Sequence, residues 1–325
     1  MKSLWSRHWF LILLAANLFL GLFAPPELHP VADNIVLRNV ILFCVLWITG
    51  LSLSADAIWQ AIKRPKYALL GVAVNAGFLP VIAWGLARLL PDQLALGLII
   101  TSIAPCTVAS AAVFTRKGGG NDAVAVMVTI ITNLGCFLTI PFWLSWTSQS
   151  VTVASSQLLH PASLAAKLVL MVVLPMILGQ ATRRLKFVDV WTTRNKERLS
   201  VVAQCGILSM VLIGAIRCGI YLRTIPMSEI IGPFMLMIGL ALLLHLVALA
   251  AGYWLSGLAG FEFPNRVAVT IAGSQKTLAV GLQLALMVGG GMAVLPMVSY
   301  HVIQLAVDSV VADRFASRGG GKTKS

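Results

Sequence analysis

Long apolar stretches alternate with short polar segments along the whole chain. A helix needs roughly 20 largely apolar residues to cross a bilayer, and ten stretches approach that length. The first resembles a signal peptide, but no small-residue cleavage site follows it, so we expect a retained helix. The ten predicted spans centre on Leu11 to Phe23, Ile35 to Leu53, Tyr67 to Leu90, Leu94 to Thr115, Ala123 to Trp146, Leu164 to Gly179, Leu199 to Leu222, Ile230 to Leu258, Val267 to Val288 and Met292 to Val311.

Only short connections link these stretches, the longest being residues 147–163 and 183–198. The second of them is expected to form a short helix at the membrane surface. The pattern predicts an all-α integral membrane protein with a single transmembrane domain over residues 1–325. Its last residues, 315–325, are basic and rich in glycine, and we expect them to be a disordered tail.

Composition supports the same class of protein. The chain is 58% hydrophobic and 11% charged, whereas about 25% of the residues of a typical soluble domain are charged. A net charge of +13 would suggest a nucleic-acid partner in a soluble protein, but here it fits basic cytoplasmic loops. The five cysteines form no CxxC pair, which argues against a zinc site or a disulfide framework. The lipid bilayer is the expected partner, with no nucleic acid and no cofactor.

The basic residues also predict the orientation. If the N-terminus is cytoplasmic, 18 Lys and Arg lie on the cytoplasmic side and four on the other, with Lys167 and Lys276 inside spans. This asymmetry follows the positive-inside rule and places both termini in the cytoplasm of a bacterial cell, with the chain in the inner membrane. The four on the outer side are Arg38, Arg88, Arg217 and Arg223.

Ten spans divide into two halves of five, roughly 8–150 and 160–314. Halves with an odd number of spans insert with opposite orientations, which is the inverted-repeat architecture of many secondary transporters. The fourth span of each half carries a similar stretch, IAPCTVASAAVF from Ile103 and IAGSQKTLAVGL from Ile271. Each holds a helix breaker, Pro105 or Gly273, next to small polar residues. We expect two broken helices whose ends meet at mid-membrane and form an ion or anion site.

Four motifs make the chain resemble the bile acid:sodium symporter family, and most closely a bacterial branch similar to solute carrier family 10 member 7. They are APCTVASAAVFTRKGGGNDAVAV from Ala104, AGSQKTLAVGLQLA from Ala272, LPMVSYHVIQL from Leu295 and GVAVNAGFLPVIAW from Gly71. The resemblance implies ten helices in two inverted repeats, with helices four and nine broken and crossing. It also implies sodium-driven uptake of a small organic anion, which passes between a core and a panel of helices.

The family's sodium-binding residues are only partly present. The resemblance assigns sodium ligands to Asn75, Ser110, Thr129 and Gln275. Three family positions are replaced, an asparagine by Ala111, a hydroxyl by Ala125, and a glutamate shared by both sodium sites by Ile271. These departures argue against coupling to two sodium ions.

Lys276 stands where the classical branch has asparagine, about ten residues and 15 Å inside its span. A lysine at a helix centre costs about 2.5–3.5 kcal/mol on insertion scales, so its ammonium must face a cavity, carbonyls or a counter-ion. It either replaces a bound sodium ion permanently or gains and loses a proton, and in both roles it can attract an anionic substrate. Its polar neighbours in the two motifs, Thr107, Ser274 and Thr277, complete the expected binding region.

Five other polar residues also lie inside the predicted spans. His301 and Gln304 share one face of the tenth span and are either near-site residues or partners in helix–helix hydrogen bonds. Asn133 lies one turn beyond Thr129 and is expected to join the cation region. His245 and Asp308 look isolated, and Asp308 is expected near the cytoplasmic end of its span.

The leading function is therefore a secondary transporter, a sodium-coupled symporter of an organic anion working by alternating access. The alternatives are a proton-coupled transporter or a cation antiporter in which Lys276 replaces a bound sodium, and a non-transporting regulator of ion balance. The chain has no HExxH or GxSxG motif and no pair of intramembrane aspartates, which argues against an enzyme. It also lacks the GxxxxGK[ST] loop of ATP-driven transport.

Overall fold

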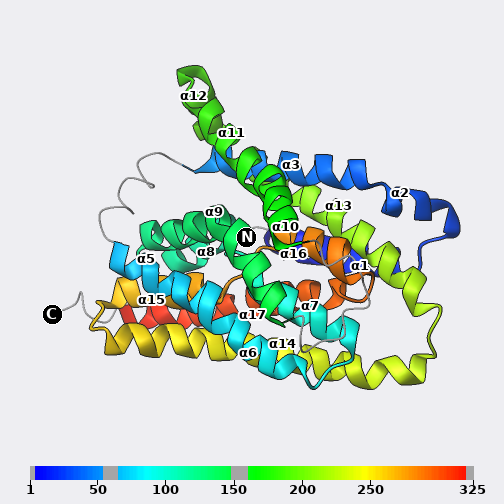
Figure 1. Ribbon diagram of the computed structural model, residues 1–325. Helices are drawn as coiled ribbons and strands as arrows, with labels where there is room; N and C mark the ends of the chain where they lie inside the picture. The colour runs from blue at the N-terminus through cyan, green and yellow to red at the C-terminus, as the bar shows by residue number, and fades with distance from the viewer. Residues whose placement is uncertain (1–3, 54–64, 148–159, 320–325) are drawn as a thin grey trace.

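The computed structural model describes residues 4–53, 65–147 and 160–319, and all of its regular elements are helical. Figure 1 shows long helices lying roughly side by side, with shorter helices between them and at their ends. The elements are α1 (Leu4–Leu22), η1 (Pro26–Leu28), α2 (His29–Asp33), α3 (Ile35–Ser52), α5 (Pro65–Val72), η2 (Ala73–Phe78), α6 (Leu79–Ala87), α7 (Asp92–Ile103), α8 (Val108–Lys117), α9 (Asp122–Thr147), α10 (Pro161–Leu168), η3 (Val169–Val173), α11 (Leu174–Arg183), α12 (Lys186–Arg194), α13 (Lys196–Leu222), α14 (Met227–Leu258), α15 (Phe263–Ser274), α16 (Leu278–Leu284), η4 (Ala285–Gly289) and α17 (Val294–Gly319).

Helices cover all ten predicted apolar stretches. By length and apolar composition, eight helices in the described residues can cross a membrane, and a ninth is counted if α1 and α2 form one span bent by 109°. The fourth predicted stretch is divided into a short apolar helix, α7, and the separate helix α8. The membrane-protein class is thus confirmed, while the ten-span arrangement stays a prediction.

Prolines inside these helices are accommodated by wider turns. Pro80 in α6 and Pro175 in α11 each follow a π-helical segment, η2 or η3. Proline lacks the N–H that would bond to the preceding turn and its ring clashes there, and a π turn relieves both problems. The helix continues through the proline, but some carbonyl groups of the π turn are left free for other partners.

The helices pack as two groups. In one, α1 and α3 lie against α13, and α11 lies against α3. In the other, α15 lies at the centre, in contact with α5, α8, α9 and α14. Helix α15 and the following α16 are buried along most of their length. A helix buried on all sides in a membrane protein can carry polar residues that a lipid-facing helix cannot.

Two polar contacts join the end of α8 and the loop after it to α17 and α15. Lys117 bonds to Asp313 at 2.8 Å, and Asn121 bonds to Asn265 at 3.0 Å. The expected surface helix is present as α12, which stands off from the other helices.

One boundary was wrong. Helix α17 continues to Gly319, so residues 315–319 are helical and are not part of a disordered tail. The reason is packing, because the buried ring of Phe315 stacks on Tyr253. The remaining tail residues lie outside the described part of the chain.

The contact between α3 and α11 is very close and uses glycines on both sides. A Cβ atom added to Gly50 of α3 would lie 2.3 Å from the carbonyl oxygen of Met176. A Cβ atom added to Gly179 of α11 would lie 2.3 Å from the carbonyl oxygen of Trp47. Small residues let membrane helices approach closely, and here the approach is backbone to backbone. No side-chain movement can relieve such a clash.

We predict that Gly179→Ala lowers the free energy of unfolding by about 1–3 kcal/mol, because α3 and α11 must separate. Gly135→Ala in α9 is the matched control, since a Cβ there has no atom within 4 Å. It is expected to be neutral or to stabilise by up to about 1 kcal/mol through helix propensity. Melting temperatures in detergent test both, and equal shifts for the two variants would contradict the packing argument.

Candidate functional site

Two buried helices are interrupted in the middle of the molecule. Helix α7 ends at Ile103 and α8 begins at Val108, while α15 ends at Ser274 and α16 begins at Leu278. Pro105 lies in the first interruption as predicted, and the residue before it is extended, as a proline requires. The second interruption is not at Gly273, which lies inside α15. Gly273 instead lets α15 approach Val74, whose side chain would be 3.1 Å from an added Cβ.

The two interruptions have the same geometry and cross each other. Thr107 and Thr277 are the N-cap residues of α8 and α16, with φ of −80° at both and ψ of 138° and 125°. Neither threonine side chain caps its helix, and both residues are half-buried. The Thr277 amide donates to the Pro105 carbonyl at 2.8 Å, which joins the two breaks directly. The structure therefore aligns Thr107 with Thr277. This alignment is shifted by two residues from the one in the sequence analysis, which paired Pro105 with Gly273.

Side chains of α9 pair the free backbone groups of the first break. The Cys106 amide donates to the Thr132 hydroxyl at 3.1 Å, and its carbonyl accepts from the Asn133 amide at 2.8 Å. Thr129 donates to the Thr107 carbonyl at 3.2 Å. Because water is absent from a membrane core, an unpaired backbone group there costs several kcal/mol, and these three side chains remove that cost.

The second break is paired in the same way from α17. Gln304 accepts from the Lys276 amide at 2.9 Å and donates to the Lys276 carbonyl at 3.0 Å. Tyr300 donates to the Ser274 carbonyl at 2.6 Å, and Asn75 of η2 donates to the Gln275 carbonyl at 2.8 Å. The central residue of each break, Cys106 or Lys276, thus has both backbone groups held by the side chains of one neighbouring helix.

The ammonium of Lys276 lies where the breaks meet and is completely buried. It donates to the Asn75 carbonyl at 2.7 Å, the Asn75 side-chain oxygen at 3.1 Å and the Ala104 carbonyl at 2.9 Å. The π turn at η2 and the proline after Ala104 leave these two carbonyls free. All three hydrogens have acceptors, and no described carboxylate forms an ion pair with the ammonium.

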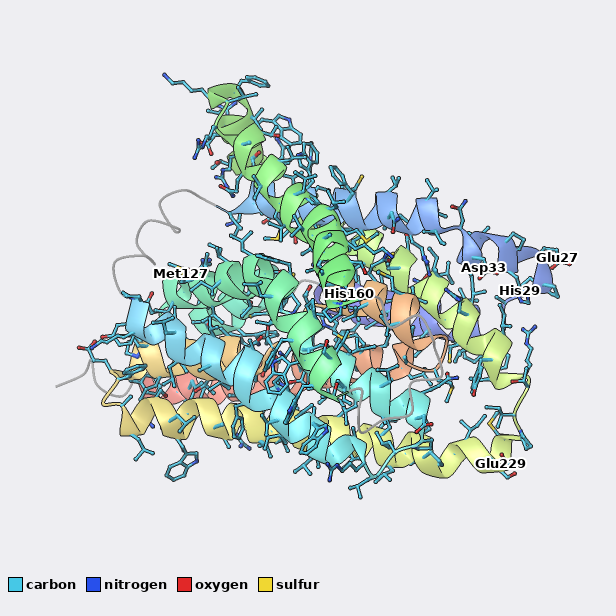
Figure 2. All side chains as sticks on the ribbon, viewed as in Figure 1. Glu27, His29, Asp33, Met127, His160 and Glu229 are labelled. Atoms are coloured by element: carbon cyan, nitrogen blue, oxygen red, sulfur yellow. The ribbon has the colours of Figure 1, made fainter. Side chains whose placement is uncertain are left out.

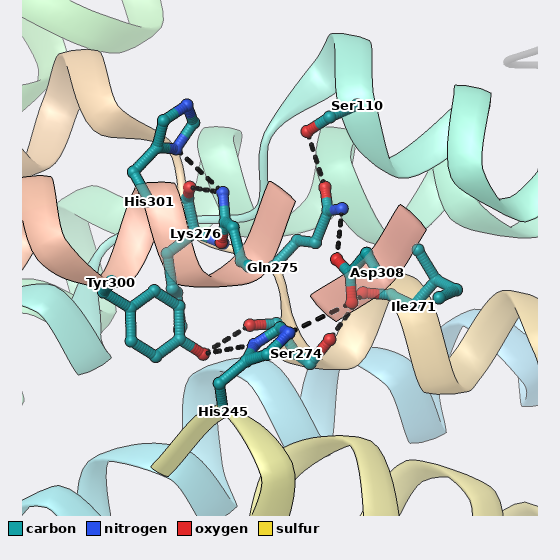
Figure 3. A network of polar contacts seen from close by, with 10 residues as sticks. Ser110, His245, Ile271, Ser274, Gln275, Lys276, Tyr300, His301 and Asp308 are labelled. Atoms are coloured by element: carbon teal, nitrogen blue, oxygen red, sulfur yellow. Dashed lines mark hydrogen bonds and ion pairs between the residues drawn. The ribbon is translucent and has the colours of Figure 1, made fainter. Parts of the chain in front are cut away.

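Gln275 joins this centre to a buried carboxylate. Figure 3 shows its amide between Ser110 and Asp308. The Ser110 hydroxyl donates to the amide oxygen at 2.7 Å, and the amide nitrogen donates to the Asp308 carboxylate at 2.6 Å. Asp308 is fully buried, and it is the one carboxylate so buried in the described residues.

His245 of α14 completes the network. Its Nδ1 lies 3.2 Å from the Tyr300 hydroxyl and its Nε2 lies 3.0 Å from Asp308 (Figure 3). Since Tyr300 donates its hydrogen to Ser274, its oxygen can only accept from Nδ1. A second hydrogen must then lie between Nε2 and the carboxylate. The pair is either an imidazolium with a carboxylate or a neutral ring with a carboxylic acid, and both forms carry no net charge.

The structure brings the predicted site residues together around the two breaks. Asn75, Thr107, Ser110, Thr129, Asn133, Ser274, Gln275, Lys276, Thr277 and Gln304 all contribute a backbone or side-chain group to the hydrogen bonds of the crossing. His301 lies one step outside, where its Nδ1 accepts from Gln304 at 2.8 Å. The three replaced family positions, Ala111, Ala125 and Ile271, are buried.

The expectation for Asp308 and His245 was wrong, because the two residues pair in the core. The sequence contains a signal that would have found Asp308. Tyr300, Gln304 and Asp308 recur every four residues and so line one face of α17, facing the second break. His245 gives no comparable signal, because its partners lie more than 50 residues away in the chain.

The known proteins that this chain resembles are named as membrane transporters. The model of the SBF-like CPA transporter family matches residues 8–317. A chloroplast protein of Arabidopsis thaliana, named a probable sodium/metabolite cotransporter, is 30% identical over 97% of this chain and 74% of its own. The sodium/bile acid cotransporter 7 of Rattus norvegicus is 24% identical over 89% of this chain and 85% of its own. The family and these relatives are transporters and not enzymes, and the chain is a multi-pass membrane protein that belongs to the SBF-like CPA transporter family.

Proposed function

We propose that the protein is a secondary active transporter that carries a small organic anion across the membrane together with a cation. The observation that carries this proposal is the crossing of two broken helices around the buried ammonium of Lys276. Broken helices that meet at mid-membrane, at the interface of two repeats, are typical binding sites of secondary transporters. The bacterial inner membrane remains the proposed location, with both termini in the cytoplasm.

Ten spans in two inverted repeats would explain the matching breaks. Each break ends in a threonine N-cap, and each has its central residue held on both sides by the helix that follows the broken pair. In the first half that helix is α9, and in the second half it is α17. Alternating access then consists of movement of the group around α15 against the group of α1, α3, α11 and α13.

Charge favours an anionic substrate. Lys276 has no ionic partner in the described residues, and the His245–Asp308 pair carries no net charge, so the crossing has a formal charge of +1. An anion next to it would neutralise this charge in a region of low dielectric. The half-buried hydroxyl side chains of Thr107, Ser110 and Thr277 lie at the two breaks and could hydrogen-bond to such an anion.

Sodium is the first candidate for the coupling ion, because the named relatives are sodium cotransporters. Ser110, Thr129 and Gln275 present oxygen atoms at the first break, where one sodium ion would be held. The oxygens of Asn75 and Ala104 are taken by the lysine. In this proposal the ammonium takes the place of a second sodium ion.

A proton is the second candidate, and the His245–Asp308 pair is the observation that favours it. Loss of its shared proton would leave a charge of −1 beside the +1 of Lys276, and the crossing would no longer attract an anion. Proton and anion would therefore bind together. The other titratable groups near the pair are Tyr300, which contacts it, and Lys276, Cys106 and His301 at the crossing.

Uptake by purified protein in liposomes tests the proposed function. We expect accumulation of a radiolabelled organic anion from a panel that includes taurocholate, a sulfated steroid and a small carboxylate. If sodium is the coupling ion, an inward sodium gradient should drive this accumulation. If the proton is the coupling ion, an inward proton gradient at constant sodium concentration should drive it. Neither gradient nor counterflow would produce uptake by a non-transporting regulator, and that outcome would overturn the proposal.

Lys276→Met should abolish uptake, because the three oxygen acceptors lose their donor and the crossing loses its positive charge. Lys167→Met in α10 is the matched control, since it removes a lysine that is only half-buried. The control should keep uptake within about two-fold of the wild type, as expected for a lysine that reaches the interface. Normal uptake by a folded Lys276→Met variant would rule out both roles of the lysine.

Asp308→Asn separates the two coupling candidates. It keeps the size of the side chain but removes the site of the shared proton. If the proton is coupled, an inward proton gradient should stimulate uptake by this variant at least about ten-fold less than uptake by the wild type, while counterflow exchange continues. Asp313→Asn is the control, because Asp313 is an exposed aspartate five residues further along α17, and it should respond like the wild type. Equal stimulation of both variants would contradict proton coupling through this pair.

A further inference from the structure

A second positive site lies at the opposite end of the molecule from the C-terminus. Arg38 is in the first turns of α3 and is 4% exposed. Its Nε and Nη1 atoms are buried and have no hydrogen-bond partner among the described residues. Buried guanidinium groups are normally paired, because their N–H groups lose water on burial.

The surroundings of Arg38 add positive charge. A second guanidinium, that of Arg217, belongs to α13, which packs against both α3 and α2. Asp33 at the end of α2 offsets this only in part, since its carboxylate lies 3.8 Å from Arg217 and is 64% exposed. The N-terminal end of α3 is itself positive, so a cation in its first turns is unfavourable. Figure 2 shows Asp33 and His29 at this end of the molecule.

We propose that Arg38 and Arg217 form an anion-binding site. The unused N–H donors of Arg38, with the second guanidinium of Arg217, match the oxygens of a carboxylate, sulfonate or phosphate group, which accept two parallel hydrogen bonds from arginine. The occupant is the acidic group of the organic anion before it reaches the crossing. Naming the occupant rests on the proposed function, but the binding of an oxyanion at this site does not.

The position of the site connects it to the crossing. Gln283 near the end of α16 donates to Asn39, the residue next to Arg38, at 2.9 Å. Helix α16 begins at Leu278, immediately after the break that contains Lys276. The short helix α16 therefore runs from the second break to the helix that carries Arg38.

Sulfate is the probe for the site. The melting temperature of purified protein in phosphatidylcholine nanodiscs should rise with sodium sulfate, compared with sodium chloride at equal ionic strength. We expect Arg38→Gln to weaken the apparent sulfate affinity at least about ten-fold, and Arg217→Gln to weaken it as well. Arg88→Gln is the matched control, because Arg88 is an exposed arginine that stacks on Trp84 at 4.0 Å, and it should respond like the wild type. Equal sulfate responses in Arg38→Gln and Arg88→Gln would overturn the proposal.

Two further arms identify the occupant. In nanodiscs that contain phosphatidylglycerol, the melting temperature should still rise with sulfate. If this response is lost and the melting temperature without sulfate is higher, the site binds a lipid headgroup and our assignment is overturned. Lys276→Met should keep the sulfate response although it loses uptake. If neither the wild type nor any variant takes up an anion, but the sulfate response still depends on Arg38, the anion site stands and the transport proposal fails. Should Arg38→Gln not fold, the half-buried Arg217→Gln decides the outcome in its place.

Discussion

The interior of this protein is organised by the need to pair the backbone groups of two broken helices where no water is available. Six side chains from α9, α17 and η2 meet that need, and they are among the most buried polar residues of the chain. A broken helix in a membrane is tolerated only with such partners. The same requirement determines which helices must surround α15, and so it shapes the packing of the whole group.

Lys276 is a direct consequence of this arrangement. Burying an ammonium in a membrane is costly, but here a π turn and a proline each supply a carbonyl that has lost its place in a helix. The lysine satisfies those carbonyls, and its ammonium brings a positive charge to the crossing. One residue therefore supplies both structural support and charge. A lysine at a membrane surface, whose ammonium reaches water, supplies no such support.

The sequence predicted the apolar stretches, the break at Pro105 and an ammonium of Lys276 that faces polar groups inside the protein, because these depend on local chemistry. It misplaced the second break at Gly273, since glycine also serves close packing, and only the structure shows that α15 continues to Ser274. It missed the pair of His245 and Asp308, which forms between helices distant in the chain. The free carbonyl of Asn75 could not be predicted either, because it depends on a π turn that the residue pattern does not encode.

The position of Gln275 explains why the buried carboxylate does not pair directly with the lysine. A direct ion pair would cancel both charges and bind neither ion nor anion strongly. An amide between them has one donating and one accepting end. While Asp308 accepts from the amide nitrogen, the amide oxygen must face Ser110. Gln275 thus joins Ser110 at the first break to Asp308 through a fixed order of donors and acceptors, with no ion pair between the two ends.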